Sequence, residues 1–346
     1  MKSRKKWLVT GASGFLGYHV CKFLIEKKQE VVATDIQDFT YTDLIDKVKF
    51  VKGDIRDLSF LKKITKGVDI VMHGAAALPR SKKDLIWDVN YNGTKNLLKA
   101  SNLNKVKRFI YISSTAVYGV PKEHPIYETA NLPGVGPYGD TKVASEKACA
   151  KYRDHMIVSI IRPKTFVGSV RLGIFSVLFD WVYEGRKLPV IGNGKNRYQL
   201  LDVDDLANAI WILSKAPAEK ANDVYNVGAK DFGTINEHMQ TLIDYRKKGK
   251  LIHFPSWLVK WPLRILDKLG LSPLYAWAYE TMDKDHFVSV DKMMKLGWKP
   301  KKKSEETLLE SYKWYAAHRN EFLNKTGTTH TVQWGQGVIG LVKKLF

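Results

Sequence analysis

The chain has little cysteine and no long uninterrupted apolar segment. Only two of its 346 residues are cysteines, Cys21 and Cys149, and they lie far apart in predicted helices. This arrangement argues against a disulfide framework or a metal site and fits a reducing compartment. No apolar run reaches the length needed to cross a bilayer, so we expect no transmembrane helix. A cytoplasmic location is expected, with peripheral membrane contact as an alternative.

The sequence shows no internal repeat and no low-complexity segment, and we expect no secretory leader. Four of the first six residues are basic, but they run into a glycine-rich turn instead of the apolar stretch of a signal peptide. The sequence therefore predicts a globular chain of one large domain or two unequal ones.

Acidic residues are scarce relative to basic ones. The chain has 35 Asp and Glu against 56 Lys and Arg, which gives a net charge of +21. Such a charge favours anionic partners: phosphorylated substrates, acidic lipid surfaces, or nucleic acid without sequence preference. The lysines are spread over the chain and no nucleic-acid-binding motif accompanies them. A solvated lysine-rich surface explains the charge equally well, and we expect no specific nucleic acid partner.

The most informative motif present lies near the N-terminus. Residues 5–10 form a short apolar run typical of a buried strand, and residues 15–27 resemble a helix. Gly11, Gly14 and Gly17 punctuate the turn between them. In dinucleotide-binding turns these glycines allow the tight turn, the approach of the pyrophosphate and close helix–strand packing. The N–H groups at the start of the helix then bind the phosphates.

An acidic residue completes this pattern. Residues 30–35 predict the second strand, and Asp35 at its end is placed to bind the ribose 2′-hydroxyl of NAD. Glycine spacing by itself also fits a plain turn. The combination of strand, turn, helix, strand and acid favours a site for NAD over that simpler explanation.

Strand-like and helix-like segments alternate through the first half of the chain. The predicted strands there are residues 48–52, 70–73, 109–113 and 156–162, and the predicted helices are residues 58–66, 88–102 and 138–153. This alternation predicts an α/β fold with a doubly wound parallel sheet. We expect a Rossmann domain over residues 1–168 to which later strands return. We expect a smaller substrate-binding part over residues 169–325, which is mostly helical and interwoven with the Rossmann domain. An amphipathic tail is expected over residues 326–346.

The candidate catalytic residues are Ser114, Tyr138 and Lys142. Tyr138 and Lys142 are four residues apart, which places both on one face of a helix. A nearby lysine ammonium is expected to lower the phenol pKa, and Lys142 is also a candidate to hold the nicotinamide ribose. Ser114 follows a predicted strand, at the sheet edge where such folds bind ligands, and is expected to bind the substrate oxygen. Alone, the Tyr–Lys pair fits an ordinary surface helix; downstream of the dinucleotide turn, the catalytic interpretation is favoured.

Short motifs continue through most of the chain. They are Thr10–Gly17, Gly53–Asp57, His73–Ala77, Asn90–Thr94, Ser113–Gly119, Tyr138–Lys142, Arg162–Pro163, Arg197 and Asp205–Ala207. Through them, residues 6–315 resemble the extended short-chain dehydrogenase/reductase family, in its epimerase/dehydratase branch. The resemblance implies an enzyme that uses NAD. It also implies a homodimer formed by residues 88–102 and 138–153, with contacts from Val89, Leu97, Leu98, Val143, Ala144 and Ala148.

The resemblance also assigns cofactor contacts. Phe15 and Leu16 lie under the pyrophosphate, and Asn90 is a weaker candidate because it is usually a helix-kink residue in this family. The other residues so implied are Asp54 and Ile55 at the adenine, Ala75 and Ala76 along the cofactor groove, and Pro163 and Thr165 beside the nicotinamide, together with Tyr138 and Lys142.

Two departures from the family pattern bear on the reaction. The 4,6-dehydratase subgroup carries Thr-Asp-Glu where this chain has Ser114, Thr115 and Ala116, so the acids needed to eliminate water are missing. Nucleotide-sugar enzymes often carry Asn at the position of Thr165, and this difference resembles the hydroxysteroid dehydrogenases. Thr115 and Arg197 join Ser114 as candidate substrate-binding residues. Arg197 fits a grip on a diphosphate and a structural hairpin arginine equally well.

The leading interpretation is a nucleotide-sugar epimerase that works through a transient keto intermediate and takes an anionic small molecule as substrate. The alternative is a 3β-hydroxysteroid- or sterol-type dehydrogenase with a lipid-like substrate. A noncatalytic NAD-binding subunit would have no need of the serine, tyrosine and lysine set and is the least favoured.

Two C-terminal segments are aromatic and basic. Residues 251–279 are rich in tryptophan. The favoured interpretation is a core helix with a basic outer face. The alternatives are a lid over an apolar substrate and a helix at a bilayer interface. Residues 334–346 are amphipathic and are expected to dock on their own domain or on a partner subunit. Asp204 and Asp205 are expected to cap a helix N-terminus.

Overall fold

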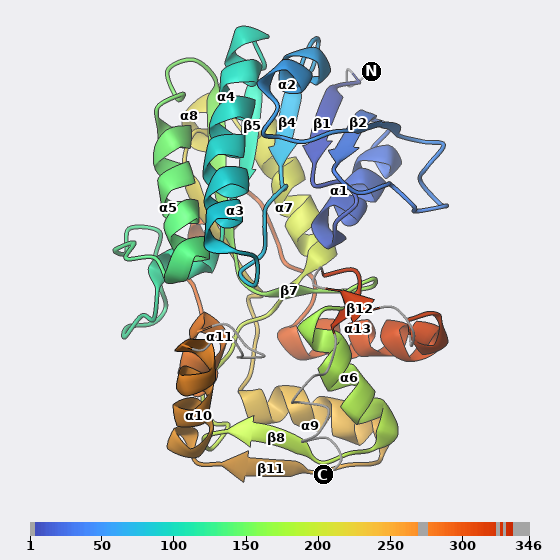
Figure 1. Ribbon diagram of the computed structural model, residues 1–346, viewed down its shortest axis with the longest axis vertical. Coiled ribbons are helices and arrows are strands. Elements are labelled where there is room, and N and C mark those ends of the chain that lie inside the picture. The colour runs from blue at the N-terminus through green and yellow to red at the C-terminus, as the bar shows by residue number, and fades with distance from the viewer. Residues whose placement is uncertain (1–3, 269–275, 323–325, 328–329, 335–346) are drawn as a thin grey trace.

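The computed structural model describes residues 4–268, 276–322, 326–327 and 330–334. Its core is a seven-stranded sheet with the order β10-β6-β5-β4-β1-β2-β3 (Figure 1). The strands are β1 (Lys6–Thr10), β2 (Glu30–Asp35), β3 (Lys49–Lys52), β4 (Ile70–His73), β5 (Arg108–Ile112), β6 (Ile157–Pro163) and β10 (Val224–Val227). Every neighbouring pair is parallel, so helices must cross between strands. The predicted α/β fold with a doubly wound parallel sheet is confirmed.

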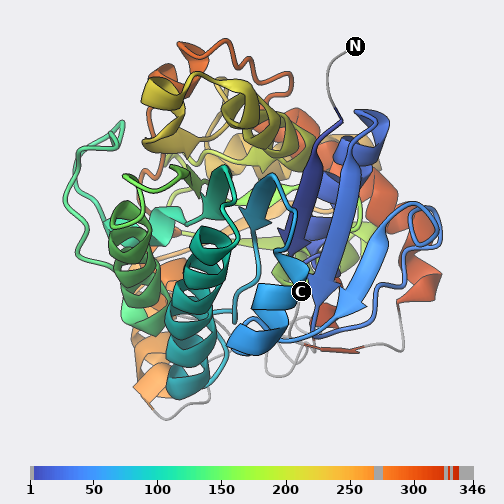
Figure 2. The same ribbon diagram turned by 90° about the horizontal axis from the view of Figure 1, so that it is seen from above.

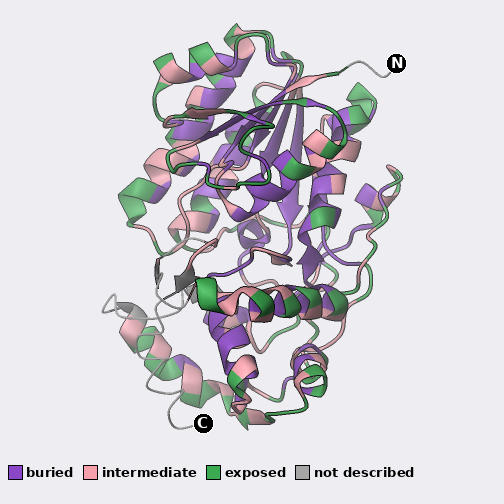
Figure 3. Ribbon diagram, turned by 90° about the vertical axis from the view of Figure 1, so that its right-hand side faces the viewer, coloured by how far each residue is buried: buried purple, intermediate pink, exposed green. Residues whose placement is uncertain are grey.

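Helices cover both faces of this sheet. They are α1 (Phe15–Glu26), α2 (Leu58–Ile64), α3 (Lys83–Trp87), α4 (Thr94–Leu103), α5 (Gly136–Ala150), α7 (Val203–Lys215) and α8 (Ala218–Ala221). In β1, Trp7 and Val9 pack with residues of α1 and α7, whereas Leu8 packs with residues of α4 and α5. Helices α4 and α5 lie side by side against one face (Figure 2). The central strands are buried on both sides, as their apolar runs predict (Figure 3).

The second half of the chain forms a smaller part below the carboxyl ends of the strands (Figure 1). This part has an apolar core of its own, which joins α6 (Ile174–Glu184), α9 (Ile235–Arg246) and α13 (Ser304–His318). Its other elements are β7 (Phe166–Val167), β8 (Leu188–Ile191), β9 (Leu201–Asp202), β11 (Leu251–Phe254), α10 (Ser256–Lys268), α11 (Ala276–Thr281), α12 (Asp291–Met294), β12 (Thr326–Gly327) and β13 (Gln333–Trp334). Strand β10, from this half, completes the Rossmann sheet beside β6. None of the described helices is long and apolar enough to cross a membrane.

One predicted helix has an irregular middle. The segment expected to be a helix over residues 88–102 begins at Lys83 and contains a π-helical turn over Asp88–Gly93. The backbone carbonyl of Asn90 accepts hydrogen bonds from the Thr94 hydroxyl (2.5 Å) and the Ser145 hydroxyl (2.9 Å). These side chains satisfy a carbonyl that the wider turn leaves without its α-helical partner.

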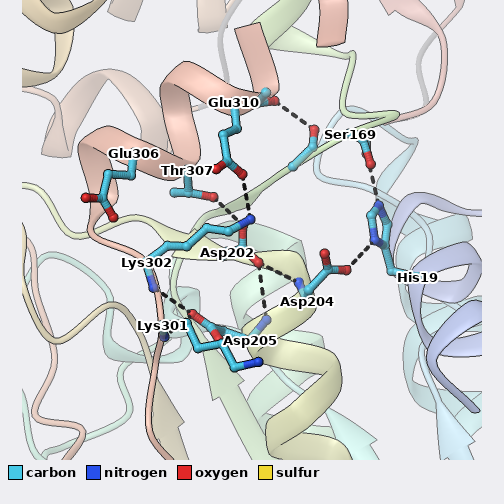
Figure 4. Close-up of polar contacts among 12 residues, drawn as sticks. His19, Ser169, Asp202, Asp204, Asp205, Lys301, Lys302, Glu306, Thr307 and Glu310 are labelled. Atoms are coloured by element: carbon cyan, nitrogen blue, oxygen red, sulfur yellow. Dashed lines mark hydrogen bonds and ion pairs between the residues drawn. The ribbon is translucent and has the colours of Figure 1, made fainter. Parts of the chain in front are cut away.

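The start of α7 shows a second difference from the sequence prediction. Asp202, and not Asp204 or Asp205, caps the helix: its carboxylate accepts from the backbone N–H of Asp204 (2.9 Å) and Asp205 (3.3 Å). Asp204 instead contacts His19 of α1 at 2.8 Å, and Asp205 accepts from the backbone N–H of Lys301 at 2.8 Å (Figure 4). The two acids therefore fasten α7 to its neighbours, which only the tertiary structure could reveal.

Two other expectations need correction. In α10, the basic residue Lys260 faces inward while Trp257 and Trp261 face solvent, so the interpretation as a core helix with a basic outer face was wrong. Of the proposed dimer contacts, Leu97, Leu98 and Ala148 are buried in the chain's own core. Residues 335–346 of the predicted amphipathic tail lie outside the described residues.

Candidate active site

The glycine-rich turn lies where β1 ends and α1 begins. Gly11 has φ +73°, and a Cβ there would lie 2.7 Å from the backbone nitrogen of Ala75, so a side chain is excluded. A Cβ on Gly17 would lie 2.1 Å from the Gly11 carbonyl oxygen, which explains the close helix–strand packing. Helix α1 starts after Gly14 with no side-chain cap and no acid in its first turn. The backbone N–H groups at Phe15 and beyond are therefore oriented to bind an anion, as a pyrophosphate requires.

Asp35 lies against this turn. Its carboxylate accepts hydrogen bonds from the backbone N–H of Ser13 (3.1 Å) and of Gln37 (3.0 Å). Burial raises the Asp35 pKa, and these hydrogen bonds act in the opposite direction. The structure thus brings together the glycine turn and the acid that sequence spacing connected, and the pair fits the pyrophosphate and ribose of NAD.

The residues expected at the adenine and along the cofactor groove follow the next two strands. Ile55 is buried beneath Gly93, where a Cβ would lie 2.7 Å from its Cδ1. Both carboxylate oxygens of Asp54 accept from the Arg56 guanidinium, at 2.6 to 3.1 Å, which lowers the Asp54 pKa. Adenine contact by Asp54 therefore remains a prediction. The backbone N–H of Ala75 donates to the Thr10 hydroxyl at 3.3 Å, which holds the start of the following loop, where Ala76 lies, beside the glycine turn.

Ser114 and Tyr138 meet at the carboxyl end of β5. Ser114 follows the strand and begins a short 3₁₀ turn over Thr115–Tyr118, where its hydroxyl accepts from the backbone N–H of Ala116 at 3.1 Å. Tyr138 lies in the first turn of α5, where the Ser114 hydroxyl acts to lower the pKa of its phenol. Thr115, the other candidate substrate residue in this turn, is buried.

Lys142 lies one turn farther along α5 and is buried. Its Nζ donates to the Ile112 carbonyl oxygen at 2.8 Å and lies over the rings of Tyr111 (4.9 Å) and Tyr138 (5.7 Å). Burial lowers the Lys142 pKa to about 8, and the Glu146 carboxylate opposes that change. The ammonium is therefore held at the face of the Tyr138 ring.

The expected effect of Lys142 on the phenol was wrong. Burial raises the pKa of Tyr138 to about 12, and the groups that act to lower it are Ser114 and the buried Arg171. Lys142 is not among these groups; its ammonium donates to the Ile112 carbonyl oxygen and lies over the Tyr138 ring. The sequence analysis missed Arg171, because the loop before α6 carries no periodic signal.

Arg171 is surrounded by aromatic rings. Its guanidinium lies 5.1 Å from the Phe15 ring centroid, 5.8 Å from that of Phe166 and 5.5 Å from that of Phe175. The residue before it, Val170, has φ +67°, a conformation that costs a β-branched residue free energy. The fold therefore holds a cation between the N-terminus of α1 and the catalytic tyrosine.

A buried ion pair lies behind the catalytic set. Glu146 accepts from the Ser113 hydroxyl at 2.5 Å and from the Arg162 guanidinium at 2.6 Å. Arg162 also donates to the Tyr118 phenol oxygen at 2.9 Å. This network connects α5, β5 and β6 directly beneath Ser114 and Lys142, so it fixes their relative positions.

The segment after β6 leads into the second half of the chain. Pro163 ends the strand, and the Thr165 hydroxyl lies 3.1 Å from the Tyr198 phenol oxygen. Lys164, which the sequence analysis did not select, is buried between the Tyr198 ring, 4.6 Å from its Nζ, and Nδ1 of His286. Burial lowers the Lys164 pKa well below its usual range.

Arg197 and Asn90 differ in how they relate to a ligand. The Arg197 guanidinium lies between the rings of Phe232 (4.6 Å) and Phe287 (4.8 Å), is exposed, and makes no ion pair within the described residues. Its N–H groups remain oriented toward solvent, as binding to a phosphate requires. The Asn90 side chain accepts from the backbone N–H of Ala77 at 2.7 Å and donates to its carbonyl oxygen at 3.2 Å, so Asn90 orders the loop after β4.

Comparison with known proteins shows which family the chain belongs to and which fold it shares. The model of the NAD dependent epimerase/dehydratase family matches residues 7–228. The uncharacterized protein y4nG of Sinorhizobium fredii is 34% identical over 345 residues, which are 98% of this chain and 85% of that protein. The UDP-glucose 4-epimerase of Lactobacillus helveticus is 27% identical and covers 92% of this chain and 100% of its own. The crystal structure of the Thermotoga maritima UDP-glucose 4-epimerase with UDP-glucose has a TM-score of 0.76, with 22% identity, and covers 91% of this chain and 99% of its own.

Proposed function

Since the chain belongs to the NAD dependent epimerase/dehydratase family, and is therefore an enzyme that uses NAD, we propose that it epimerises a secondary alcohol carbon of a nucleotide-sugar. The observation that carries the proposal is the buried Lys142, whose Nζ lies 5.7 Å from the centre of the Tyr138 ring, with Ser114 acting on the same phenol. Bound NAD supplies the hydride acceptor for oxidation and the donor for the return step.

The residues of this chain supply the proton chemistry. Ser114 binds the reacting alcohol oxygen, and Tyr138 takes up the hydroxyl proton as a keto group forms and returns it when the opposite face is reduced. Arg171 provides the positive charge that favours the transient phenolate. Lys142, fixed over the tyrosine ring, orients the nicotinamide ribose.

The absence of an acid next to Ser114 supports epimerisation over dehydration. Thr115 and Ala116 are both buried, and neither can protonate a leaving hydroxyl as a carboxylic acid would. An epimerase requires only one acid–base group at the oxygen, together with a substrate that can present both faces of its keto form.

Arg197 supports a substrate with a diphosphate. A guanidinium held between two rings keeps a defined orientation and presents two parallel N–H groups, which match phosphate oxygens. The net charge of +21 also attracts an anionic substrate.

A second candidate is a hydroxysteroid-type dehydrogenase. It is favoured by Thr165, because many nucleotide-sugar enzymes carry asparagine at this position. The Thr165 hydroxyl contacts the Tyr198 phenol oxygen. In this alternative the same catalytic set oxidises a sterol-like alcohol, and NADH leaves after each turnover.

Thermal unfolding with a ligand panel separates the two candidates. With NAD present, UDP or another nucleoside diphosphate should raise the Tm, because a ligand that binds only the folded state stabilises it. Arg197→Ala should abolish that increase, while Lys195→Ala, in the same exposed hairpin, should keep it. Conversion of the stabilising nucleotide-sugar to its epimer then establishes the reaction. A Tm increase with a hydroxysterol and none with any nucleotide would replace the proposal with the second candidate.

A further inference from the structure

Helix α10 has an inverted arrangement of polar and apolar residues. Trp257 and Trp261 are 72% and 66% exposed, whereas Lys260 between them is only 7% exposed. A surface helix normally buries its apolar side and exposes its charges. Packing in the chain's own core therefore does not explain why the outward side of α10 is apolar.

Ion pairs fix the helix in this orientation. The Lys260 ammonium pairs with the Asp283 carboxylate and donates to the Glu280 carbonyl oxygen at 3.2 Å. The Arg264 guanidinium binds the Glu280 carboxylate through two hydrogen bonds of 2.6 and 3.0 Å. Because both cations are used to hold α10 against Glu280 and Asp283, rotation of its apolar side inward would break these pairs.

The exposed apolar residues lie on one side of the helix. Trp257, Trp261 and Ile265 follow a four-residue spacing, and Leu258 adjoins them. Leu258 and Ile265 are 47% and 42% exposed. We call these four residues the α10 face. Tryptophan has an apolar ring system and a polar N–H, a combination that favours the boundary between water and lipid.

The sequence around the α10 face is basic, and of its cations Lys260 and Arg264 are paired with Asp283 and Glu280. Residues 246–266 contain six Lys and Arg and no Asp or Glu. Lys247, Lys248 and Lys250 are exposed where the chain enters β11, the strand that leads into α10. Figure 1 shows β11 and α10 together at the end of the molecule opposite the N-terminus.

Charge decides which partner fits this end of the molecule. A second copy of the chain bound symmetrically here would place like charges against each other, in addition to its own net charge of +21. An anionic bilayer offers the opposite charge, attracts each nearby Lys or Arg, and accepts tryptophan at its interface.

We propose that the α10 face docks on an anionic lipid bilayer, with Trp257, Leu258, Trp261 and Ile265 in the interface and Lys247, Lys248 and Lys250 at the lipid headgroups. This surface is separate from the catalytic set, so the inference holds whichever alcohol the enzyme oxidises.

Vesicle co-sedimentation tests the inference with the full chain. The native protein should sediment with vesicles of phosphatidylcholine and phosphatidylglycerol but not with phosphatidylcholine alone, and added salt should weaken this binding. Trp257→Ser with Trp261→Ser should weaken binding about tenfold or more, because binding strength depends on the buried apolar area. Lys247→Gln with Lys248→Gln and Lys250→Gln should also weaken it.

A matched control removes exposed apolar side chains elsewhere. Ile45→Ser with Leu103→Ser takes away two exposed residues of the Rossmann domain and should leave vesicle binding unchanged. All variants should keep the native Tm and NAD affinity, which shows that folding is intact. Equal binding by the tryptophan variant, or no binding by the native protein, overturns the proposal. If the tryptophan variant instead changes the oligomeric state in light scattering without vesicle binding, the α10 face is a contact between copies.

Discussion

Tyr138 is the residue whose environment determines how the site handles protons. Burial raises its pKa to about 12, so the phenol is protonated at neutral pH and is prepared to act as an acid. Its use as a base depends on the two groups that oppose this shift, the Ser114 hydroxyl and the Arg171 guanidinium. Reduction of a carbonyl, in which the phenol donates its proton, therefore begins from the protonation state that Tyr138 has at neutral pH.

Loss of the phenol hydroxyl should remove this proton transfer. We expect Tyr138→Phe to keep the fold and NAD affinity and to lose ~10²–10⁴-fold in kcat, the usual contribution of a positioned acid–base group. Steady-state kinetics on the identified substrate and NAD titration measure both quantities. Tyr152→Phe, in the turn that follows the same helix, is the control and should retain activity. Full activity in Tyr138→Phe would exclude the phenol from the mechanism.

Lys142 should give the activity a pH limit on the alkaline side. Its pKa is lowered to about 8, so the ammonium is charged below this pH and loses its proton above it. If the charged form orients the cofactor, kcat/KM should fall as the pH rises through about 8. Lys142→Met should bind NAD more weakly, turn over more slowly, and lack this alkaline decline. A native profile that stays flat from pH 7 to pH 9 would contradict the role.

Asp35 should determine cofactor choice. Its carboxylate lies beside the glycine turn and repels a 2′-phosphate, and Ile36 and Gln37 after it offer no cation to receive one. We expect tighter binding of NAD than of NADP, and a reduced preference in Asp35→Ser. Parallel titrations with both cofactors measure this, and an unchanged ratio in the variant would show that another residue discriminates. Asp38→Asn, three residues farther on and exposed, is the matched control.

At the scale of elements, the buried pair of Glu146 and Arg162 holds α5 against β5 and β6. Glu146→Gln should destabilise the chain by roughly 3–5 kcal/mol, because it leaves the Arg162 charge buried without its partner. Urea unfolding measures the change. Asp38→Asn removes the exposed pair with Lys52 and should cost less than about 1 kcal/mol. Similar values for the two variants would mean that the buried pair contributes no more than a surface one.

The irregular helix before α4 shows how a loop is ordered by a side chain. Asn90 lies in the π-helical turn and binds both backbone groups of Ala77, in the loop that continues from the cofactor groove. The family resemblance identified Asn90 as a helix-kink residue. In the structure, the Asn90 side chain reaches from the irregular turn to the backbone of Ala77 and orders the loop there.

At the scale of the whole molecule, the expected homodimer remains a prediction with a smaller set of contacts. Leu97, Leu98 and Ala148 lie in the chain's own core, and the half-buried Val89 and Val143 pack against it. Of the expected contacts, this leaves the half-buried Ala144 outside these clusters. Light scattering at micromolar concentration should give twice the chain mass of 39.5 kDa. Ala144→Glu should shift the mass to that of one chain, because it places a charge in the proposed contact. A native mass of 39.5 kDa would contradict the dimer.

The sequence by itself determined the sheet and the cofactor turn of this protein. Strands β2 and β4 have the predicted bounds because their apolar residues and flanking turns are local signals. Gly11, Gly17 and Asp35 were identified by spacing, since the backbone of a dinucleotide turn requires particular residue types at fixed intervals. The candidate catalytic set rests on the same kind of local signal, a motif within one helix and the strand before it, and stays a prediction.

Tertiary structure decided what depends on residues distant in the chain. The pKa of Tyr138 is determined by its burial and by Arg171, which approaches from a loop 33 positions later. The outward direction of α10 depends on ion pairs with Glu280 and Asp283, because helical periodicity shows which residues share a side but not which side faces the core. The state of Lys164 also depends on distant residues. Burial against Tyr198 and His286 lowers its pKa, and no local sequence pattern specifies this packing.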